Sequence, residues 1–238
     1  AIVLILFGIG SVGMFSYEKI FNSNELVSEQ NSNSGENKKV TFPDGSFAYL
    51  NNSTLVNYPN NFKKTNRLIN IKGEAFFDVK TNPSKPFIIK AKKAKIEVLG
   101  TSFNVRTNEN DNVEVFVKSG KVKLSQVNNE QNFLIIEPGY IGVIAQDEIK
   151  KMKNDNQNYL SWVTKKLYFK DTQLQYVTQT LKKTYNVKIT IEESINSDSL
   201  SLTSTFDDES IHYILDVISR TFGIQVKQIN KKQYLLTN

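Results

Sequence analysis

Apolar and polar residues alternate along much of the stretch 67–106. From Ile69 to Val79 the odd positions are small or apolar, and most of the even positions are polar. A period of two is typical of a β-strand with one buried face, because successive side chains point to opposite sides of the strand. After the prolines at 83 and 86, the apolar residues change parity twice before Val105. Each change requires a turn or a bulge, so the pattern predicts several short strands.

The same kind of pattern covers residues 40–149. Short apolar runs are separated by turn-forming pairs such as Asp44-Gly45, Ser119-Gly120 and Pro138-Gly139. Proline presets one backbone angle and glycine accepts a positive φ, which is why these residues favour tight turns. Many short strands without a helical window predict an all-β domain over 40–149. A sandwich, a jelly roll and a solenoid-like arrangement are all compatible with this sequence.

The last third of the chain contains an internal repeat with a period of 37 residues. Phe169 aligns with Phe206 without a gap, and three further pairs are identical: Asp171, Tyr176 and Thr184 with Asp208, Tyr213 and Thr221. Within each copy, apolar residues recur at helical spacing and an alternating run follows. We expect two β-α-β units that form a small α+β domain over 161–238, with 200–206 as the first strand of the second unit. Asp171 and Asp208 stand where each carboxylate would cap its helix or lie in its first turn.

Three further segments differ in composition from these two regions. Residues 1–17 carry no charge, and as a helix they would span about 25 Å of the ~30 Å hydrocarbon core of a bilayer. We therefore expect residues 1–20 to belong to a transmembrane helix that is truncated at its N-terminus. A secretory signal peptide is the rival interpretation, but a basic n-region and a small-x-small cleavage site are missing. The polar stretches 21–39 and 150–160 are interpreted as a linker and a hinge.

The composition argues against several kinds of chemistry. The net charge of +6 comes from 30 Lys and Arg against 24 Asp and Glu, and the lysines are spread along the chain, which favours a solvated surface over a nucleic-acid site. The chain has no cysteine, and its single histidine, His212, has no metal-ligand or triad pattern around it. Glu74 and Asp78 would lie about 13 Å apart along a strand, too far for a glycosidase pair. We expect no enzymatic activity, no cofactor and no metal site.

The β-rich region resembles a known family in the order of its motifs. These are FPDGSFAYLNNSTLVNYPNNF at 42–62, IKGEAFFDV at 71–79, PFII at 86–89, VLGTSFNV at 98–105, KSGKV at 118–122 and IEPG at 136–139. They resemble the FecR domain, the periplasmic part of FecR-type transmembrane sigma-factor regulators. Turn and core residues make up most of these motifs, and we interpret them as structural: Asp44, Gly45, Gly73, Glu74, Phe77, Gly100, Phe103, Asn104, Gly120, Pro138 and Gly139. The repeat over 166–236 resembles the secretin and TonB short N-terminal domain.

The resemblance implies a signalling role without catalysis. A FecR-like protein would be a single-pass anti-sigma factor or sigma regulator of the inner membrane, with residues from about 18 onward in the periplasm. It would receive a signal from the signalling domain of a TonB-dependent outer-membrane transporter and relay it to a cytoplasmic ECF sigma factor, through a segment before Ala1. Whether the transporter takes up a siderophore or a glycan is left open by the sequence, and so is the direction of regulation.

The partner contact itself is predicted to use an exposed strand edge of the repeat domain. Two segments are candidates for backbone pairing with a partner strand, 187–191 and 199–205. Their apolar or β-branched members are Val187, Ile189, Ile191, Leu200, Leu202 and Thr203. The alternative function is a membrane-tethered glycan-binding β domain. Its binding face would be an exposed aromatic platform of Phe42, Phe47, Tyr49, Tyr58 and Phe62.

Overall fold

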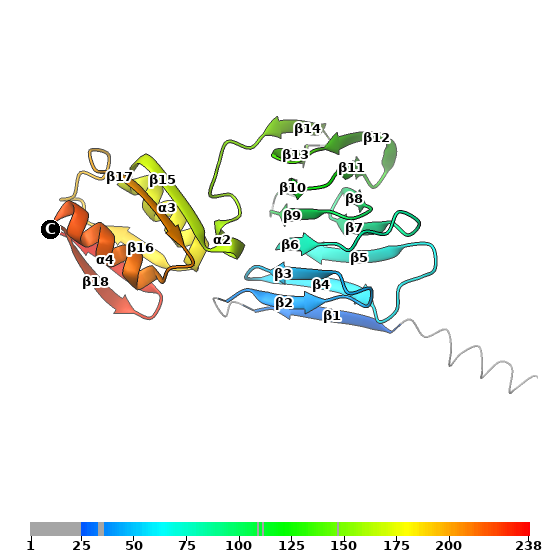
Figure 1. Cartoon of the computed structure of the whole chain (residues 1–238), viewed down its shortest axis with the longest axis horizontal. Coiled ribbons are helices and arrows are strands. Elements are labelled where there is room, and N and C mark those ends of the chain that lie inside the picture. Colours follow the sequence, from blue (N-terminus) through cyan, green and yellow to red (C-terminus); the bar gives the residue numbers. More distant parts are fainter. Residues whose placement is uncertain (1–24, 33–35, 109, 111, 147) are drawn as a thin grey trace, which may run out of the picture.

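The computed structural model describes residues 25–32, 36–108, 110, 112–146 and 148–238. These residues form a β-sandwich that is followed by a smaller α+β domain (Figure 1). The expected transmembrane segment 1–20 lies outside the described residues. Within the described ranges, no helix has the length and hydropathy needed to span a membrane.

The sandwich consists of two seven-stranded sheets. The first sheet has, in spatial order, β1 (Leu26–Asn31), β4 (Thr54–Pro59), β5 (Arg67–Lys72), β7 (Phe87–Ala91), β8 (Ala94–Val98), β11 (Val122–Gln126) and β12 (Asn129–Ile136). The second has β14 (Glu148–Lys153), β13 (Tyr140–Ala145), β10 (Val113–Ser119), β9 (Ser102–Thr107), β6 (Glu74–Asp78), β3 (Phe47–Leu50) and β2 (Lys38–Thr41). The chain passes back and forth between the sheets, and the strands stack in sequence order from β1 to β14 (Figure 1). The domain is therefore a solenoid-like sandwich, one of the arrangements compatible with the sequence.

The core lies between the two sheets and confirms the predicted alternation. Every odd apolar residue from Ile69 to Val79 is buried, and the residues that follow are buried in the predicted parity: Phe87, Ile89, Ala91, Ala94, Ile96, Val98, Phe103 and Val105. The first change of parity falls at the tight connection between β7 and β8, where Ala91 pairs with Ala94 and Lys92 has a positive φ. Strand register and turn geometry together keep the apolar face inward.

Two predicted boundaries of the sandwich are wrong. Residues 26–31 of the expected linker form β1, which pairs with β4 along its whole length, and residues 38–41 contain β2. Likewise, residues 148–153 form β14, so that the irregular connection between the domains is limited to 154–160. Both β1 and β14 are edge strands with mostly exposed or half-buried residues. Backbone pairing holds them in place, so they lack the apolar pattern that identifies a buried strand.

The second domain confirms the 37-residue repeat. Its elements are α2 (Ser161–Thr164), β15 (Lys166–Gln173), α3 (Leu174–Tyr185), β16 (Lys188–Ile191), β17 (Ser201–Asp207), α4 (Ile211–Phe222), β18 (Gln225–Asn230) and β19 (Gln233–Thr237). The bounds of α3 and α4 differ by 37 residues at both ends. β15 pairs with β17, and β19 lies between β16 and β18 in a three-stranded sheet. Both helices pack on one apolar core that the two units share.

The predicted capping role of the two aspartates is wrong. The N-caps of α3 and α4 are Gln173 and Ser210, and the Ser210 hydroxyl accepts a hydrogen bond from the Tyr213 amide at 3.1 Å. Asp171 and Asp208 lie two residues earlier, each with a positive φ, 47° and 57°. Aspartate tolerates this left-handed conformation better than most side chains, which explains the identity at both repeat positions.

Arg67 connects several segments at one end of the sandwich. Its side chain is 1 % exposed, and its Nη1 donates to Asp44 Oδ2 at 2.7 Å and to the Lys80 carbonyl at 2.9 Å. Its Nε donates to the Lys85 carbonyl at 2.9 Å, and the guanidinium lies 5.3 Å from the centre of the Phe87 ring. One buried cation thus joins the turn before β3, the first residue of β5 and the connection from β6 to β7.

Asp44→Asn is expected to lower the free energy of unfolding by about 3 kcal/mol, because it leaves the Arg67 guanidinium buried without a counter-charge. Urea unfolding of the whole chain measures this loss. Asp207→Asn is the matched control, since Asp207 forms its ion pair with Lys166 at the exposed surface, and it should change stability by less than about 1 kcal/mol. Equal effects of the two variants would contradict the structural role of the buried pair.

The stability that Asp44→Asn loses should also depend on pH. Burial raises the pKa of Asp44, but hydrogen bonds from Arg67 and Ser46 and the charge of Arg67 outweigh it, so the net pKa lies below the ordinary value of 3.8. The carboxylate therefore stabilises the fold fully above pH 3.8, and this contribution disappears as the pH falls through the folded-state pKa. The stability difference between the unmodified chain and Asp44→Asn should shrink over that range.

Gly73→Ala should destabilise the sandwich more than Gly139→Ala. Both glycines have a positive φ, but a Cβ at Gly73 would lie 2.6 Å from Thr54 Oγ1 and 2.8 Å from Thr54 Cα, whereas nothing lies within 4 Å at Gly139. We expect a loss of about 1 kcal/mol at Gly139 from backbone strain alone and more than about 2 kcal/mol at Gly73. Thermal or urea unfolding of the two variants side by side tests the difference.

Candidate protein-interaction site

A groove runs between helix α3 and strand β16 in the second domain. It has a volume of about 500 Å³ and is lined by Gln175, Thr178, Gln179 and Lys182 from α3 and by residues 187–191. β16 is an edge strand, because the order of its sheet is β16-β19-β18. A helix beside an open strand edge is the arrangement that receives an extended peptide as an additional strand.

The backbone hydrogen bonds of β16 show which groups are directed to its open edge. The amides of Lys188 and Glu192 donate to the carbonyls of Lys232 and Leu236 at 2.8 and 2.9 Å. Backbone groups alternate in direction along a strand, so Ile189 and Ile191 turn their N–H and C=O groups away from β19. No strand within the described ranges pairs with that side of β16.

The end of α3 fixes the width of the groove. Asn186 adopts a left-handed conformation, with φ 51°, and its amide donates to the Lys182 carbonyl, so that the helix stops and the chain turns directly into β16. Lys165 Nζ donates to the Thr184 carbonyl at 2.5 Å and lies 4.9 Å from the centre of the Tyr185 ring. A cation at this position complements the negative end of the helix dipole. Burial lowers the pKa of Lys165, and the charge of Asp208 opposes this effect.

Both predicted contact segments lie on edge strands. Residues 187–191 include β16, and residues 199–205 overlap β17, which pairs with β15 on one side. The side chains of Ile189 and Leu202 are buried, those of Val187, Ile191 and Leu200 pack on the core while partly exposed, and only Thr203 is exposed. A partner at either edge would therefore contact mainly backbone groups, and the interface itself stays a prediction.

The groove-lining residues of α3 were not predicted from the sequence. Gln175, Thr178 and Gln179 follow the spacing i, i+3, i+4, so they form a polar stripe on the helix. Apolar spacing identifies the buried face of a helix, whereas a short polar stripe is indistinguishable from an ordinary solvated face. The groove could have been predicted only from the combination of this polar stripe with the edge strand that follows it in the sequence.

The motif residues of the sandwich mostly have contacts within the fold. Asp44 and Gly45 form the tight turn before β3, and the rings of Phe77 and Phe103 stack 5.4 Å apart in the core. Gly100 and Gly120 lie close to other backbone segments, and Gly139 follows Pro138 in the turn before β13. The sequence assigned no contact to Glu74 and Asn104. The structure shows that Glu74 accepts hydrogen bonds from Asn51 Nδ2 and Asn104 Nδ2, both at 2.9 Å.

The aromatic platform of the alternative function is not formed. Phe42 and Tyr58 are buried, at 2 % and 7 % exposed, and the rings of Phe47, Tyr49 and Phe62 are partly covered. Phe42 packs against Tyr58, with ring centres 5.0 Å apart in an edge-to-face arrangement. These side chains contribute to the core and its margin, so the observation on which the glycan-binding alternative depended is absent.

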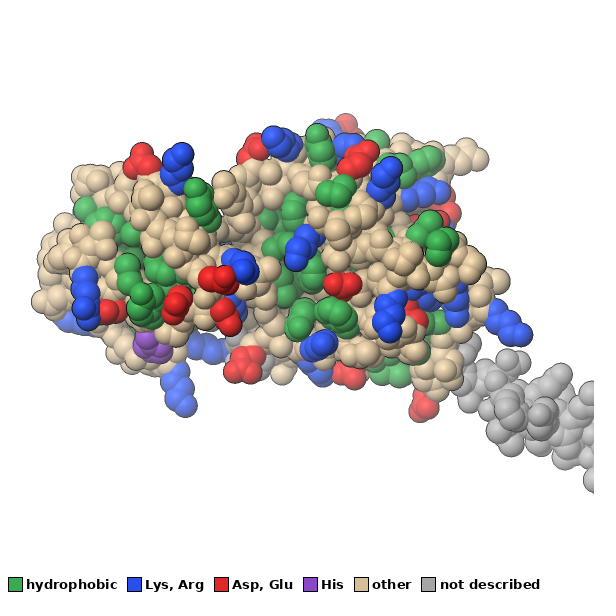
Figure 2. Space-filling model, in the orientation of Figure 1, with side chains coloured by type: hydrophobic (Ala, Val, Ile, Leu, Met, Phe, Trp, Pro, Cys, Tyr) green, Lys and Arg blue, Asp and Glu red, His purple; other side chains and the backbone are tan. Residues whose placement is uncertain are grey.

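Charged groups are distributed over the visible surface without a large single-sign area (Figure 2). His212 lies in the first turn of α4, and its Nε2 is 3.2 Å from the Tyr234 hydroxyl. Within the described ranges, no group of three or more His, Cys, Asp or Glu side chains is placed to hold a metal ion.

The fold and the open strand edge define a two-domain protein suited to contacts with other proteins. Family models identify its class more narrowly. The model for the FecR protein matches residues 28–123, and the model for the FecR C-terminal region matches residues 166–236. Two crystal structures of a proposed anti-sigma factor from Parabacteroides distasonis are 30 % identical to the chain. They cover 90 % and 89 % of it and 99 % of their own chains, with TM-scores of 0.61 and 0.62. Among curated proteins, none matches significantly. The chain belongs to the FecR family.

Proposed function

We propose that this chain is the receiving part of an anti-sigma regulator. Its family and its likeness to the Parabacteroides distasonis proteins support a regulatory role in which a sigma factor is a partner. In this proposal the chain is anchored in the inner membrane, its two domains lie in the periplasm, and it acts without catalysis. The signal comes from the periplasmic signalling domain of a TonB-dependent outer-membrane transporter and passes to a cytoplasmic ECF sigma factor.

The observation that carries the proposal is the open edge of β16 beside the groove along α3. Ile189 and Ile191 offer two N–H and two C=O groups to an incoming strand, by the alternation described above. Main-chain pairing gives affinity in such complexes, and the side chains that line the groove give selectivity. The polar stripe of α3 and the cation of Lys182 favour a segment with polar or acidic side chains on the helix-facing side.

The whole chain should bind the signalling domain of the TonB-dependent transporter that is encoded beside its gene. Titration calorimetry in detergent micelles measures this affinity, and we expect micromolar binding, as is common for transient signalling contacts. The signalling domain of a transporter encoded elsewhere is the control for specificity. If no co-encoded signalling domain binds, the receiving role is wrong.

Gln175→Trp should weaken this binding at least about tenfold, because the indole would fill the groove beside β16. Gln225→Trp is the matched control: it adds the same side chain at an exposed position of β18, the opposite edge strand of the same sheet. Circular dichroism verifies that both variants are folded. Weakening by Gln225→Trp alone would place the contact on β18, whereas no effect of either variant would remove the groove from the interface.

A further inference from the structure

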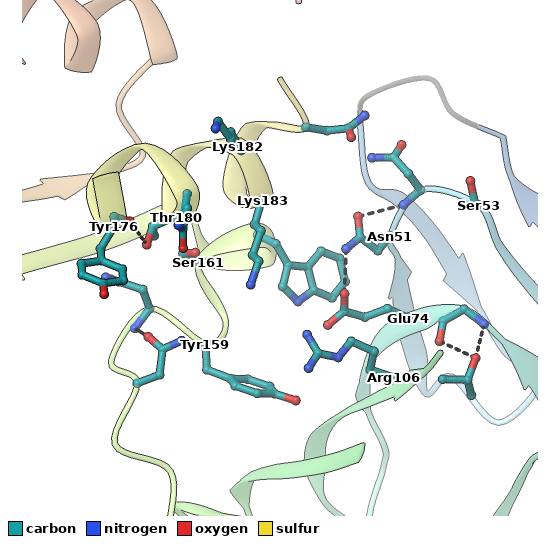
Figure 3. A pocket seen from close by; sticks show the side chains of 18 residues that line it. Asn51, Ser53, Glu74, Arg106, Tyr159, Ser161, Tyr176, Thr180, Lys182 and Lys183 are labelled. Atoms are coloured by element: carbon teal, nitrogen blue, oxygen red, sulfur yellow. Dashed lines mark hydrogen bonds between the residues drawn. The ribbon is translucent and has the colours of Figure 1, made fainter. Parts of the chain in front are cut away.

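A second cavity lies between the two domains, away from the open edges of β16 and β17. This interdomain cleft has a volume of about 800 Å³, within the range typical of small-molecule sites. One wall comes from the sandwich and includes Glu74 and Arg106, the second from the connection 156–162, and the third from α3 (Figure 3). The cleft shares only Gln179 and Lys182 with the groove along β16.

Most polar groups of the cleft walls already have partners within the chain. Both carboxylate oxygens of Glu74 accept hydrogen bonds from asparagine side chains, and Arg106 pairs with Glu114. Asn158 exchanges two hydrogen bonds, both at 2.8 Å, with the backbone of Tyr168. These side chains hold the walls of the cleft in place, and their hydrogen-bonding groups are already used within the chain.

Two buried donors in the cleft wall have no such partner. The Trp162 side chain is 5 % exposed, and its Nε1 is buried without a hydrogen-bond partner within the described part of the chain. The same is true of the Tyr159 hydroxyl. Buried polar groups are nearly always paired in folded proteins. The acceptor Asn104 Oδ1 is also buried without a partner and lies near the Tyr159 hydroxyl, but it does not account for the Trp162 donor, so an acceptor is missing from this cavity.

Both donors are held in fixed positions. The Tyr159 ring packs on Phe116 with ring centres 4.8 Å apart, and the Arg106 guanidinium lies 6.0 Å from its centre. The Trp162 carbonyl accepts a hydrogen bond from Asn37 Nδ2 at 2.8 Å, which ties this residue to the start of the sandwich. Donors that are positioned before binding lose little entropy when a ligand arrives.

The Tyr159 hydroxyl remains a donor over the whole physiological pH range. Burial raises its pKa above the ordinary value, the charges of Glu114 and Glu74 add to this rise, and Arg106 opposes it. Asn104 also lowers this pKa, although its side chain and the hydroxyl do not form a hydrogen bond of normal geometry.

Lys183 adds a positive charge, and its ammonium group forms no ion pair within the described residues. Its side chain extends from α3 toward the space between Tyr159 and the Glu74 and Arg106 side chains (Figure 3). A lysine in the last turn of a helix is often explained by the helix dipole, but Lys165 already bonds the Thr184 carbonyl at this end. Arg106 is paired with Glu114, so Lys182 and Lys183 against Glu74 leave a surplus of one positive charge, which fits a ligand with one negative charge better than one with several.

We propose that the interdomain cleft binds a ligand through one carboxylate group, which accepts hydrogen bonds from Trp162 Nε1–H and the Tyr159 hydroxyl and is neutralised by Lys183. The rings of Trp162, Tyr159 and Tyr176 line the same cavity and suit an apolar or aromatic body next to the carboxylate. The carboxylate can belong to a free organic acid or to the C-terminus of a peptide. This site is separate from the strand contact proposed above, although the two share Gln179 and Lys182.

The single tryptophan of the chain makes occupancy directly measurable. In the ¹⁵N-labelled whole chain, the one indole N–H signal should shift saturably on titration with 3-phenylpropionate, or with the peptide acetyl-Gly-Gly-Phe bearing a free C-terminus. The neutral amides of both compounds are the matched controls and should leave the signal in place. A response to the acid alone identifies a small-molecule site, and a response to the peptide alone identifies a C-terminus receptor; either supports the proposal.

Two variants test the assigned contacts. Lys183→Gln should weaken binding about tenfold, because a charge-assisted hydrogen bond is lost. Lys227→Gln, an equal loss of charge on the exposed strand β18, should leave binding unchanged. Trp162→Phe removes the indole N–H while keeping a ring, and calorimetry should show weaker binding for this variant also.

Four outcomes would overturn the proposal. The first is the absence of a saturable shift with both acids, in which case an ordered structural water occupies the position of the acceptor. The second is an equal shift with the neutral amides, which would mean that only the apolar body is recognised. The third is an equal effect of Lys183→Gln and Lys227→Gln, and the fourth is full affinity in Trp162→Phe.

Discussion

The buried guanidinium of Arg67 is the contact on which the form of the sandwich depends. Arg67 begins β5 and lies opposite Phe87, the first residue of β7, in the one parallel pair among the described strands of this domain. Parallel neighbours need a crossover, and here the chain crosses to the second sheet as β6 and returns. Arg67 binds the returning connection between β6 and β7 at two points, the carbonyls of Lys80 and Lys85. The pair with Asp44 joins the preceding layer to the same point, so that successive layers are stacked in register.

The stack ends in a connection that is anchored at both ends. The chain leaves β14, places Tyr159 on Phe116 of β10, and enters α2 with Trp162 buried and bonded to Asn37. An irregular segment of seven residues, 154–160, would ordinarily allow free domain rotation. Here a change in domain orientation must separate aromatic contacts that are already formed. The relative position of the domains is therefore a defined state, and a ligand in the interdomain cleft would favour it over others by its contacts with both walls.

Sequence patterns predicted the parts of this structure that depend on burial. The alternation from Ile69 to Val105 identified the core, and the 37-residue repeat identified two helices of equal length. The edge strands β1 and β14 were missed because they are held by backbone bonds and have no apolar face. The interdomain cleft could not be predicted, since Glu74, Tyr159 and Lys183 are far apart in sequence and meet only through tertiary structure. The same is true of the open edge of β16, which depends on the position of β19, a strand without a counterpart in the first unit of the repeat.

Helix α3 is the element through which the two proposed sites can influence each other. Gln179 and Lys182, three residues apart and therefore neighbours on one face of α3, line both the interdomain cleft and the groove along β16. The end of this helix is fixed by Lys165 and Asn186, so a displacement of α3 toward the cleft changes the width of the groove as well. Coupling between two binding sites is reciprocal. If a bound carboxylate draws α3 toward the cleft and changes the affinity of the groove for an added strand by some factor, the bound strand changes the affinity of the cleft for the carboxylate by the same factor. The proposed strand contact and the proposed carboxylate site are thus linked through one helix.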